Sequence, residues 1–216
     1  MKIKHLIASS LLGFIINVAS AGNGSAGIGY SSDYFREGSL VSAESLQASA
    51  AYELKAGGLN AGFGIFTNQP TAGGVDTYII DASISKALND TFSASLGLEH
   101  TELVAGVATL DITASVSLNS ILNPSLTVKR DTEDDLYVVE VGASHDLDFE
   151  IAQLRLSALY GNADVSSTSN VDYYSVGASL SRSLSENSSV EASLDYVDSD
   201  LISNESIFGI GLTIKF

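Results

Sequence analysis

The chain of 216 residues has no cysteine, no tryptophan and only two prolines. The absence of cysteine excludes disulfides, zinc–thiolate sites and thiol nucleophiles. Pro70 and Pro124 both fall between runs of alternating apolar residues. Long apolar runs are missing beyond the amino terminus, where no segment approaches the roughly 18 consecutive apolar residues of a membrane helix. Any residence in a membrane must therefore be as a β-barrel or by association with the surface.

Basic residues are also scarce. The chain has 10 Lys and Arg against 26 Asp and Glu, which gives a formal net charge of −16. This balance argues against nucleic acid as a partner, because such binding needs Lys and Arg on phosphates. It favours cations instead. Since 45% of the residues are hydrophobic and only 17% are charged, the composition is not that of a disordered chain.

The amino terminus has the pattern of a secretory signal peptide. Lys2 and Lys4 form a positive segment, an apolar stretch follows over residues 6–18, and the small residues 19–21 form a cleavage site. We therefore expect residues 1–21 to be a signal peptide. Residues 22–216 are then the exported protein, which we expect to form one domain.

Apolar residues alternate with small or polar ones through nearly all of residues 22–216, which is the period of a β-strand. The pattern predicts about twelve strands, near 25–35, 45–54, 59–67, 76–87, 91–101, 107–118, 125–131, 135–145, 151–162, 172–183, 189–198 and 208–216. An even number of strands, each about 9–11 residues long, is typical of bacterial membrane barrels. The connections after the first, third, ninth and eleventh strands read as longer and polar, for example 68–75, 163–171 and 199–205, as expected of outer loops. We predict an all-β, antiparallel transmembrane β-barrel, with a secreted soluble β-sandwich as the alternative.

The last nine residues form the clearest strand. Phe208, Ile210, Leu212, Ile214 and Phe216 alternate with glycine or polar residues, and the chain ends on the aromatic ring. Aromatic side chains belong at the lipid–water boundary of a barrel. The ending resembles the assembly signal of bacterial outer-membrane barrels, so Phe208 and Phe216 are the predicted signal and the barrel-assembly machinery is an expected partner. A chance edge strand of a soluble sheet is the alternative.

If the apolar face is turned toward lipid, the opposite face lines the lumen and is acidic. The predicted pore-lining residues are Asp81, Glu99, Asp111, Glu140, Arg155 and Glu191. Serine and glycine fill most other lumenal positions and leave space, and space lined by acids concentrates cations. We expect a porin-like channel for passive diffusion of small cationic or neutral solutes. The alternative is a closed structural or adhesive barrel, in which Lys129, Arg155 and Lys215 pair with the acids and the outer loops bind a partner.

No catalytic residue, cofactor or metal is predicted. Only His100 and His145 follow the signal peptide, and the Gly-x-Ser-x-Gly motif of many hydrolases is absent. The acidic run 131–135 lacks the glycine and ligand spacing of an EF-hand loop. The expected location is the outer membrane, with lipid and lipopolysaccharide as the surrounding partners.

Several short motifs resemble a known family. Residues 32–38 read Ser-Asp-Tyr-Phe-Arg-Glu-Gly, in which Tyr34, Phe35, Arg36 and Gly38 resemble a motif of the first strand in TorF-like porins of Gram-negative bacteria. Residues 57–64, 135–140, 158–161 and 172–177 resemble other family segments. Glu37 departs from the motif, and residues 65–66 stand where the family has tryptophan. The resemblance implies an outer-membrane barrel with a transport role, and it implies no catalytic residues.

Overall fold

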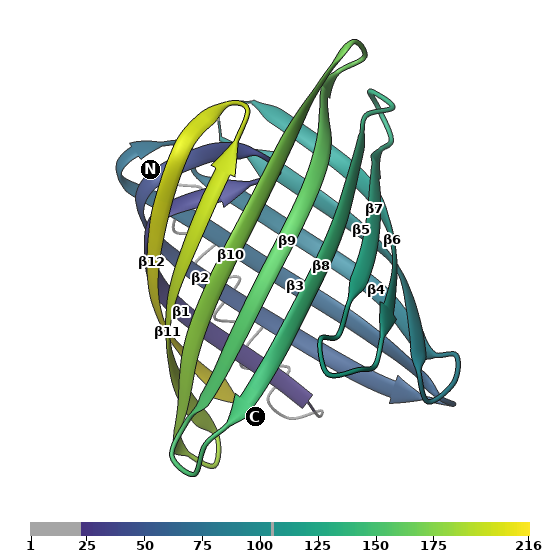
Figure 1. The fold of residues 1–216 in the computed structure, drawn as a ribbon, viewed down its shortest axis with the longest axis vertical. Coiled ribbons are helices and arrows are strands. Elements are labelled where there is room, and N and C mark those ends of the chain that lie inside the picture. Colours follow the sequence, from purple (N-terminus) through teal and green to yellow (C-terminus); the bar gives the residue numbers. More distant parts are fainter. Residues whose placement is uncertain (1–22, 105) are drawn as a thin grey trace.

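The computed structural model describes residues 23–104 and 106–216, which form a single closed, antiparallel barrel of twelve strands (Figure 1). Each strand pairs with the next along the chain, and β1 pairs with β12 to close the ring. This confirms the predicted fold class and excludes a two-sheet sandwich. The predicted signal peptide lies outside the described residues. Among the described residues, no helix is long and apolar enough to cross a membrane.

The strand bounds agree with the predicted ones except that several strands are longer. They are β1 (Asn23–Arg36), β2 (Ser39–Ala56), β3 (Leu59–Gly74), β4 (Thr77–Ala87), β5 (Phe92–Leu103), β6 (Val107–Leu118), β7 (Ser125–Asp131), β8 (Tyr137–Asp148), β9 (Gln153–Ser166), β10 (Ser169–Ser185), β11 (Ser188–Ser199) and β12 (Ile202–Lys215).

Both ends of the described chain lie at the same end of the barrel. The Gly24 amide donates to the Phe216 carbonyl and the Phe216 amide donates to the Gly24 carbonyl, each over 3.0 Å. The last residue therefore closes the seam of the barrel. We call this end of the barrel the terminal end. The half of the barrel next to it is the near half. The opposite end and half are the far end and the far half.

The outer wall carries a belt of exposed apolar side chains. Ile28, Val176 and Leu194 are 66%, 56% and 58% exposed, although each lies in a regular strand. Tyr160 and Tyr174 stand on the same surface toward the far end, where their hydroxyls donate to Asp172 and Asp198. A closed barrel with an apolar belt and aromatic residues near its edge presents the surface that outer-membrane barrels present to lipid.

The expected long outer loops are absent among the described residues, and that prediction was wrong. β3 continues to Gly74, the β9–β10 connection is only residues 167–168, and the β11–β12 connection is only residues 200–201. Main-chain hydrogen bonds between strands continue through polar residues beyond the end of the apolar alternation. The alternation marks only the part of a strand that faces lipid. Pro70 likewise lies inside β3, beside a register shift, where a proline is tolerated.

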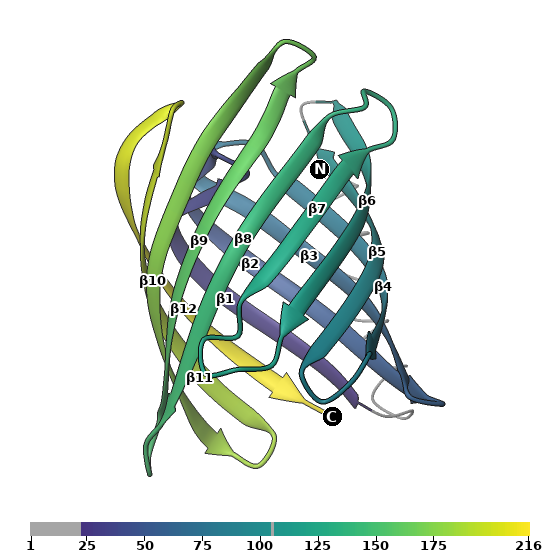
Figure 2. The same ribbon diagram turned by 45° about the vertical axis from the view of Figure 1, so that its right-hand side comes forward.

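The first hairpin departs from the wall at the far end. β1 pairs with β12 only as far as Ser31 and Gly209, whereas its pairing with β2 continues to Arg36 and Ser39. Among the described strands, the last part of β1 therefore pairs with β2 alone. Figure 2 shows this part of β1, in purple, inside the ring of strands.

Two irregularities bend the hairpin inward. The β1–β2 register shifts between Tyr34 and Phe35, and the β2–β3 register shifts at Glu44, whose φ is 40°. Such bulges bend a strand and increase its twist. The turn consists of Glu37 and Gly38, with φ of 49° and 83°, as in the two-residue turns that need positive φ at both positions. We call residues 35–39 the tip.

Candidate functional site

The lumen of the barrel is the candidate functional site. Its far half, which contains the tip, is lined differently from its near half. A cavity of about 670 Å³ occupies the far half, where the tip forms part of its lining. A smaller cavity of about 280 Å³ lies in the near half against β1, β2, β10, β11 and β12. Glycines make room for large lumenal groups: a Cβ on Gly161 would lie 2.2 Å from the ring of Tyr173, and one on Gly64 would lie 2.1 Å from the Asp81 carboxylate.

A row of four carboxylates runs around the lumenal wall of the far half. Asp81 of β4 is directly opposite Glu99 of β5, Glu99 is opposite Asp111 of β6, and Asp111 is opposite Asp131 of β7. Like charges placed directly opposite one another across strands destabilise a sheet. The repeated placement is therefore a cost to stability that stronger local interactions must offset. We call these four residues the carboxylate row.

Four charged side chains join the tip to the opposite wall. Arg36 lies 2.6 Å from a carboxylate oxygen of Glu99, and Lys129 lies 3.0 Å from Glu37. The two remaining contacts, Arg36 to Glu37 and Lys129 to Glu99, are each 3.4 Å. In ring order, β5 and β7 are far from β1, so these contacts cross the lumen. We call Arg36, Glu37, Glu99 and Lys129 the four-charge cluster.

The cluster is largely shielded from water. The side chains of Arg36 and Lys129 are 15% and 17% exposed, and those of Glu37 and Glu99 are 27% and 22% exposed. Burial opposes the ionisation of Glu37, but the charges of Arg36 and Lys129 outweigh it and hold the pKa of this carboxyl below its usual value. Glu37 is therefore charged at neutral pH, and the cluster contains two basic and two acidic side chains.

On its other side the tip packs against β10 and β11. The Phe35 and Tyr173 rings meet edge to face with their centroids 6.0 Å apart. A Cβ on Gly38 would lie only 2.8 Å from a methyl group of Val171, and the Ser199 hydroxyl donates to the Gly38 carbonyl over 2.7 Å. Val171 and Tyr173 are each only 2% exposed, so the tip covers these lumenal side chains.

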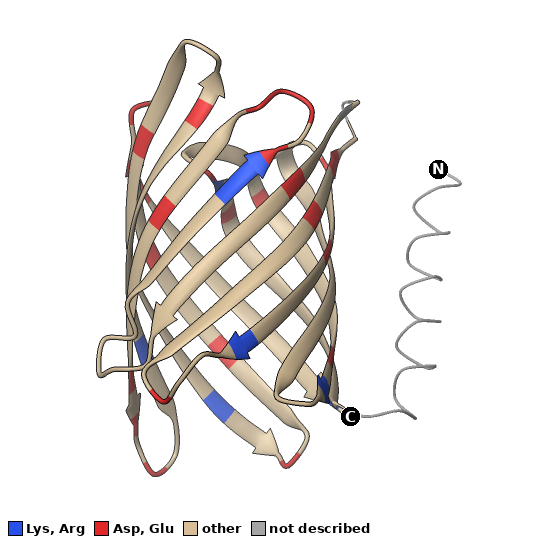
Figure 3. Ribbon diagram, turned by 90° about the vertical axis from the view of Figure 1, so that its right-hand side faces the viewer, with Lys and Arg blue, Asp and Glu red and all other residues tan. Residues whose placement is uncertain are grey.

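Several acids of the far cavity have no basic partner. Among the described residues no ion pair involves Asp33, Asp81, Glu140 or Asp195, all of which line it. Glu140 accepts a hydrogen bond from the Tyr173 hydroxyl over 2.8 Å. Figure 3 shows acidic residues gathered mainly toward the far end, with few basic residues among them.

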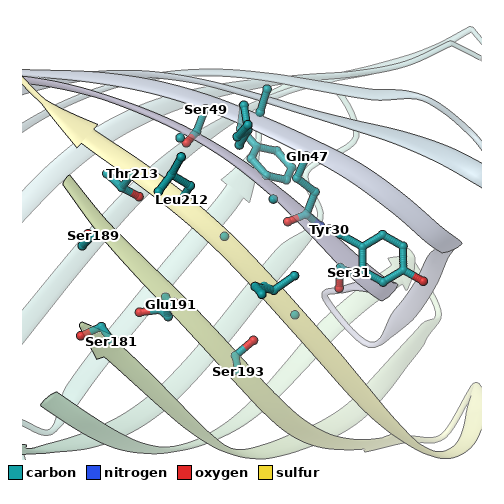
Figure 4. Close-up of a pocket in the computed structure, with 18 residues that line it drawn as sticks. Tyr30, Ser31, Gln47, Ser49, Ser181, Ser189, Glu191, Ser193, Leu212 and Thr213 are labelled. Atoms are coloured by element: carbon teal, nitrogen blue, oxygen red, sulfur yellow. The ribbon is translucent and has the colours of Figure 1, made fainter. Parts of the chain in front are cut away.

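The near half is lined by small hydroxyl groups. Figure 4 shows Ser181, Ser189 and Ser193 near Glu191. On the β5–β6 wall, the hydroxyls of serines 93 and 117 and of serines 95 and 115 pair at 2.6 Å. Small side chains cannot meet across the barrel, so this half keeps open space.

The structure places all six predicted pore-lining residues on the lumenal face. Asp81, Glu99, Asp111 and Glu140 lie in the far half, whereas Arg155 and Glu191 lie in the near half. Arg155 pairs with Asp146 over 2.7 Å on the neighbouring strand and does not reach the far acids. Lys129 does pair with lumenal acids, as the closed-barrel alternative expected. An effect of these residues on passing solutes stays a prediction.

The remaining predicted residues fall into two places. Tyr34, Phe35, Arg36 and Gly38 of the family-like motif all belong to the inward bend or to the tip. Phe208 lies on the outer surface, 47% exposed, and Phe216 lies at the seam, so an assembly role for the two rings stays a prediction.

Sequence reasoning missed several residues of the far half. Glu37 is visible in the sequence only as a departure from a motif, and Asp131 only as part of an acidic run, although it continues the alternation of Lys129. No pattern indicated that Tyr173 would meet a hairpin far away in the chain. Within residues 23–104 and 106–216, no group of three or more His, Cys, Asp or Glu is placed to hold a metal ion.

Comparison with known proteins supports the fold alone. No family model matches the chain, and no curated protein matches it. A NanC porin structure matches with a TM-score of 0.59 and 10% identity, covering 90% of this chain and 100% of that one. A KdgM porin in complex with disordered oligogalacturonate matches with a TM-score of 0.57 and 8% identity, covering 90% and 99%. The COG4313 outer membrane channel from Pseudomonas putida F1 matches with a TM-score of 0.59 and 9% identity, covering 90% and 96%.

The protein therefore has the fold of outer-membrane channel barrels. Barrels with this fold and this apolar surface reside in the outer membrane, which is the location that the sequence predicted.

Proposed function

We propose that this protein is an outer-membrane channel through which small cationic or neutral solutes diffuse passively. The terminal end faces the periplasm, as in single-chain barrels with an even number of strands, and the far end faces outward. Lipid and lipopolysaccharide surround the apolar belt, and the barrel-assembly machinery inserts the chain through its final strand. The motif in residues 32–38 is consistent with membership of the TorF-like porins, and the proposed role is transport without catalysis.

One observation carries the cation preference: the far cavity holds carboxylates that form no ion pair with a base within residues 23–104 and 106–216. Arg36 and Lys129 are occupied by Glu37 and Glu99, which leaves Asp81, Glu140 and Asp195 facing open space. A water-filled constriction with unbalanced acids raises the local concentration of cations and repels anions. The KdgM structure has an oligogalacturonate bound, a chain of carboxylated sugars. An acidic lumen is a poor match for such a polyanion, so we propose a different solute class here.

A second candidate function is a closed barrel with a structural or adhesive role. The burial of Val171 and Tyr173 favours it, because the tip fills part of the lumen. In that case the paired strands that reach the far end, rather than loops, would provide the binding surface.

Ion selectivity in a planar bilayer tests the channel. In a KCl gradient we expect discrete steps and a reversal potential on the cation side. Asp81→Asn combined with Glu140→Gln should move the reversal potential toward zero. Asp135→Asn, which removes a carboxylate from the exposed Arg130–Asp135 pair, should not move it. A folded protein without steps would favour the closed barrel, and an unchanged reversal potential would exclude Asp81 and Glu140 from the selective region.

A further inference from the structure

The tip crosses the lumen and contacts both sides of the wall. On one side Arg36 and Glu37 reach β5 and β7 through the four-charge cluster. On the other side Gly38 packs against Val171 of β10 and accepts a hydrogen bond from Ser199 of β11. A solute that travels along the barrel axis meets these residues at the far end.

The two attachments differ in kind. The β10–β11 side is an apolar contact reinforced by one hydrogen bond, whereas the β5–β7 side depends entirely on charge. Removal of the carboxylates would leave Arg36 and Lys129 as like charges in a shielded space, where repulsion is strong. The attachment to β5 and β7 therefore becomes repulsive when its acids are neutralised.

The backbone of the tip is built for this attachment. Glu37 occupies a turn position with φ of 49°, which asparagine, aspartate and glycine adopt far more readily than glutamate. A residue held in a sparsely populated conformation raises the energy of the folded state, and interactions with the surrounding structure must offset this cost. The longer glutamate side chain is what reaches Lys129 across the lumen. The departure from the family-like motif at Glu37 thus coincides with the contact that spans the barrel.

We propose that the β1–β2 tip is the gate of the channel, held across the lumen by Arg36, Glu37, Glu99 and Lys129. This inference rests on the proposed channel function and names its regulation. The bulges near Phe35 and Glu44 are the points at which the hairpin bends. When the cluster is intact the tip restricts passage through the far half. When the cluster is neutralised the tip leaves β5 and β7, and the passage widens.

Single-channel conductance of a neutralised variant tests the gate. For Glu37→Gln combined with Glu99→Gln, we expect conductance to rise about twofold or more, because the narrowest part of a pore limits conduction. Loss of two lumenal acids would by itself lower cation conductance, so a rise reports widening. The single variant Glu99→Gln keeps the tip sequence intact and should change conductance in the same direction. Asp135→Asn is the matched control and should leave conductance unchanged.

A reversible lock makes the test specific to the tip. An ideal Cβ on Gly38 lies 3.6 Å from the Val171 Cβ, within the range that a disulfide requires, and the φ of 83° at Gly38 adds strain to a cysteine there. The natural chain has no cysteine, so Gly38→Cys with Val171→Cys introduces one defined pair. In the neutralised variant, the disulfide holds Gly38 at its native place beside Val171 and so limits movement of the tip. Oxidation should therefore lower conductance to the wild-type value or below it, and reduction should restore the larger conductance. Oxidised and reduced glutathione set the redox state of the pair, and a mobility shift of unboiled samples on gels reports the folded barrel.

The outcomes separate the two proposals. If wild-type channels conduct and the neutralised variants conduct equally, or if oxidation has no effect on the locked variant, the gate is wrong and the channel function stands. If neither the folded wild type nor the folded neutralised variants conduct, the channel function is wrong and the gate fails with it. Passage of uncharged sugars of graded size into liposomes provides an independent readout, since it does not depend on the charge of the lumen.

Discussion

The near and far halves of the lumen are built by the same twelve strands but have different interiors. In the near half, serine and glycine line a cavity, and no ion pair between described residues crosses the lumen there. In the far half, large and charged side chains meet across the barrel because β1 leaves the wall and brings the tip inside. The comparison shows that strand number sets the width of a barrel, whereas one bent hairpin decides how much of that width remains open.

The largest effect on conductance is expected from filling the near half. Ser181→Trp places a large ring into the near cavity, where a small hydroxyl now stands. We expect conductance to fall about twofold or more, because a second narrow section is added to the pore. The measurement is single-channel conductance in a planar bilayer. Leu180→Trp is the control, since Leu180 faces outward with 51% exposure; an equal fall in both variants would contradict the proposed path.

A smaller effect, on the stability of the barrel, is expected from disturbing the packing of the far half. Gly161→Ala would bring a Cβ to within 2.2 Å of the Tyr173 ring and displace the ring that packs against Phe35. Overpacking of this kind costs about 1–3 kcal/mol. The barrel should lose its folded gel mobility at a lower temperature. Gly73→Ala, where a Cβ would meet nothing within 4 Å, should leave that temperature unchanged. A stable Gly161→Ala barrel would show that the far half is less tightly packed than its burial indicates.

The smallest effect is expected from acid. Because the pKa of the Glu37 carboxyl is lowered in the folded protein, its charge stabilises the docked tip at pH values above the usual pKa of glutamate. This stabilisation is lost as the pH falls through the lowered pKa. We expect steady conductance from neutral pH down to the reference glutamate pKa of 4.5, with opening only below it. The groups that face Glu37 are Arg36 and Tyr34 on β1, Glu99 on β5, Asp111 on β6, Lys129 on β7 and Tyr173 on β10.

Glu37→Gln supplies the control for acid opening. This variant lacks the carboxyl whose protonation is proposed to release the tip, so it should show no acid step of its own. An acid step of the same size in Glu37→Gln would contradict the role of Glu37.

The alternation of side chains was sufficient to predict the barrel and the face of each strand. It placed Asp81, Glu99 and Asp111 on the lumenal side, because residues two apart along a strand share a face. It failed at the far end of β3, β9 and β10, where polar residues continue to pair although they face no lipid. Alternation reports the contrast between lipid and lumen, so it ends where the lipid ends.

The tip could not be predicted for a different reason. Its bend depends on bulges near Phe35 and Glu44, which a period of two does not reveal. Its position depends on Lys129 and Val171, which lie far from it in sequence. The motif at residues 34–38 was visible as a unit, but only the structure shows that it spans the lumen.

The contacts of the tip also have a consequence for the order of folding. Glu37 and Lys129 are 92 residues apart, and Gly38 and Ser199 are 161 residues apart, so these contacts close some of the longest loops in the chain. Contacts between distant residues form slowly, because the entropy of loop closure is lost before they are made. Each wall of the barrel, by contrast, grows from neighbouring hairpins. We therefore expect the tip contacts, like the β1–β12 seam that pairs Ser25 with Lys215, to form after the hairpins between neighbouring strands.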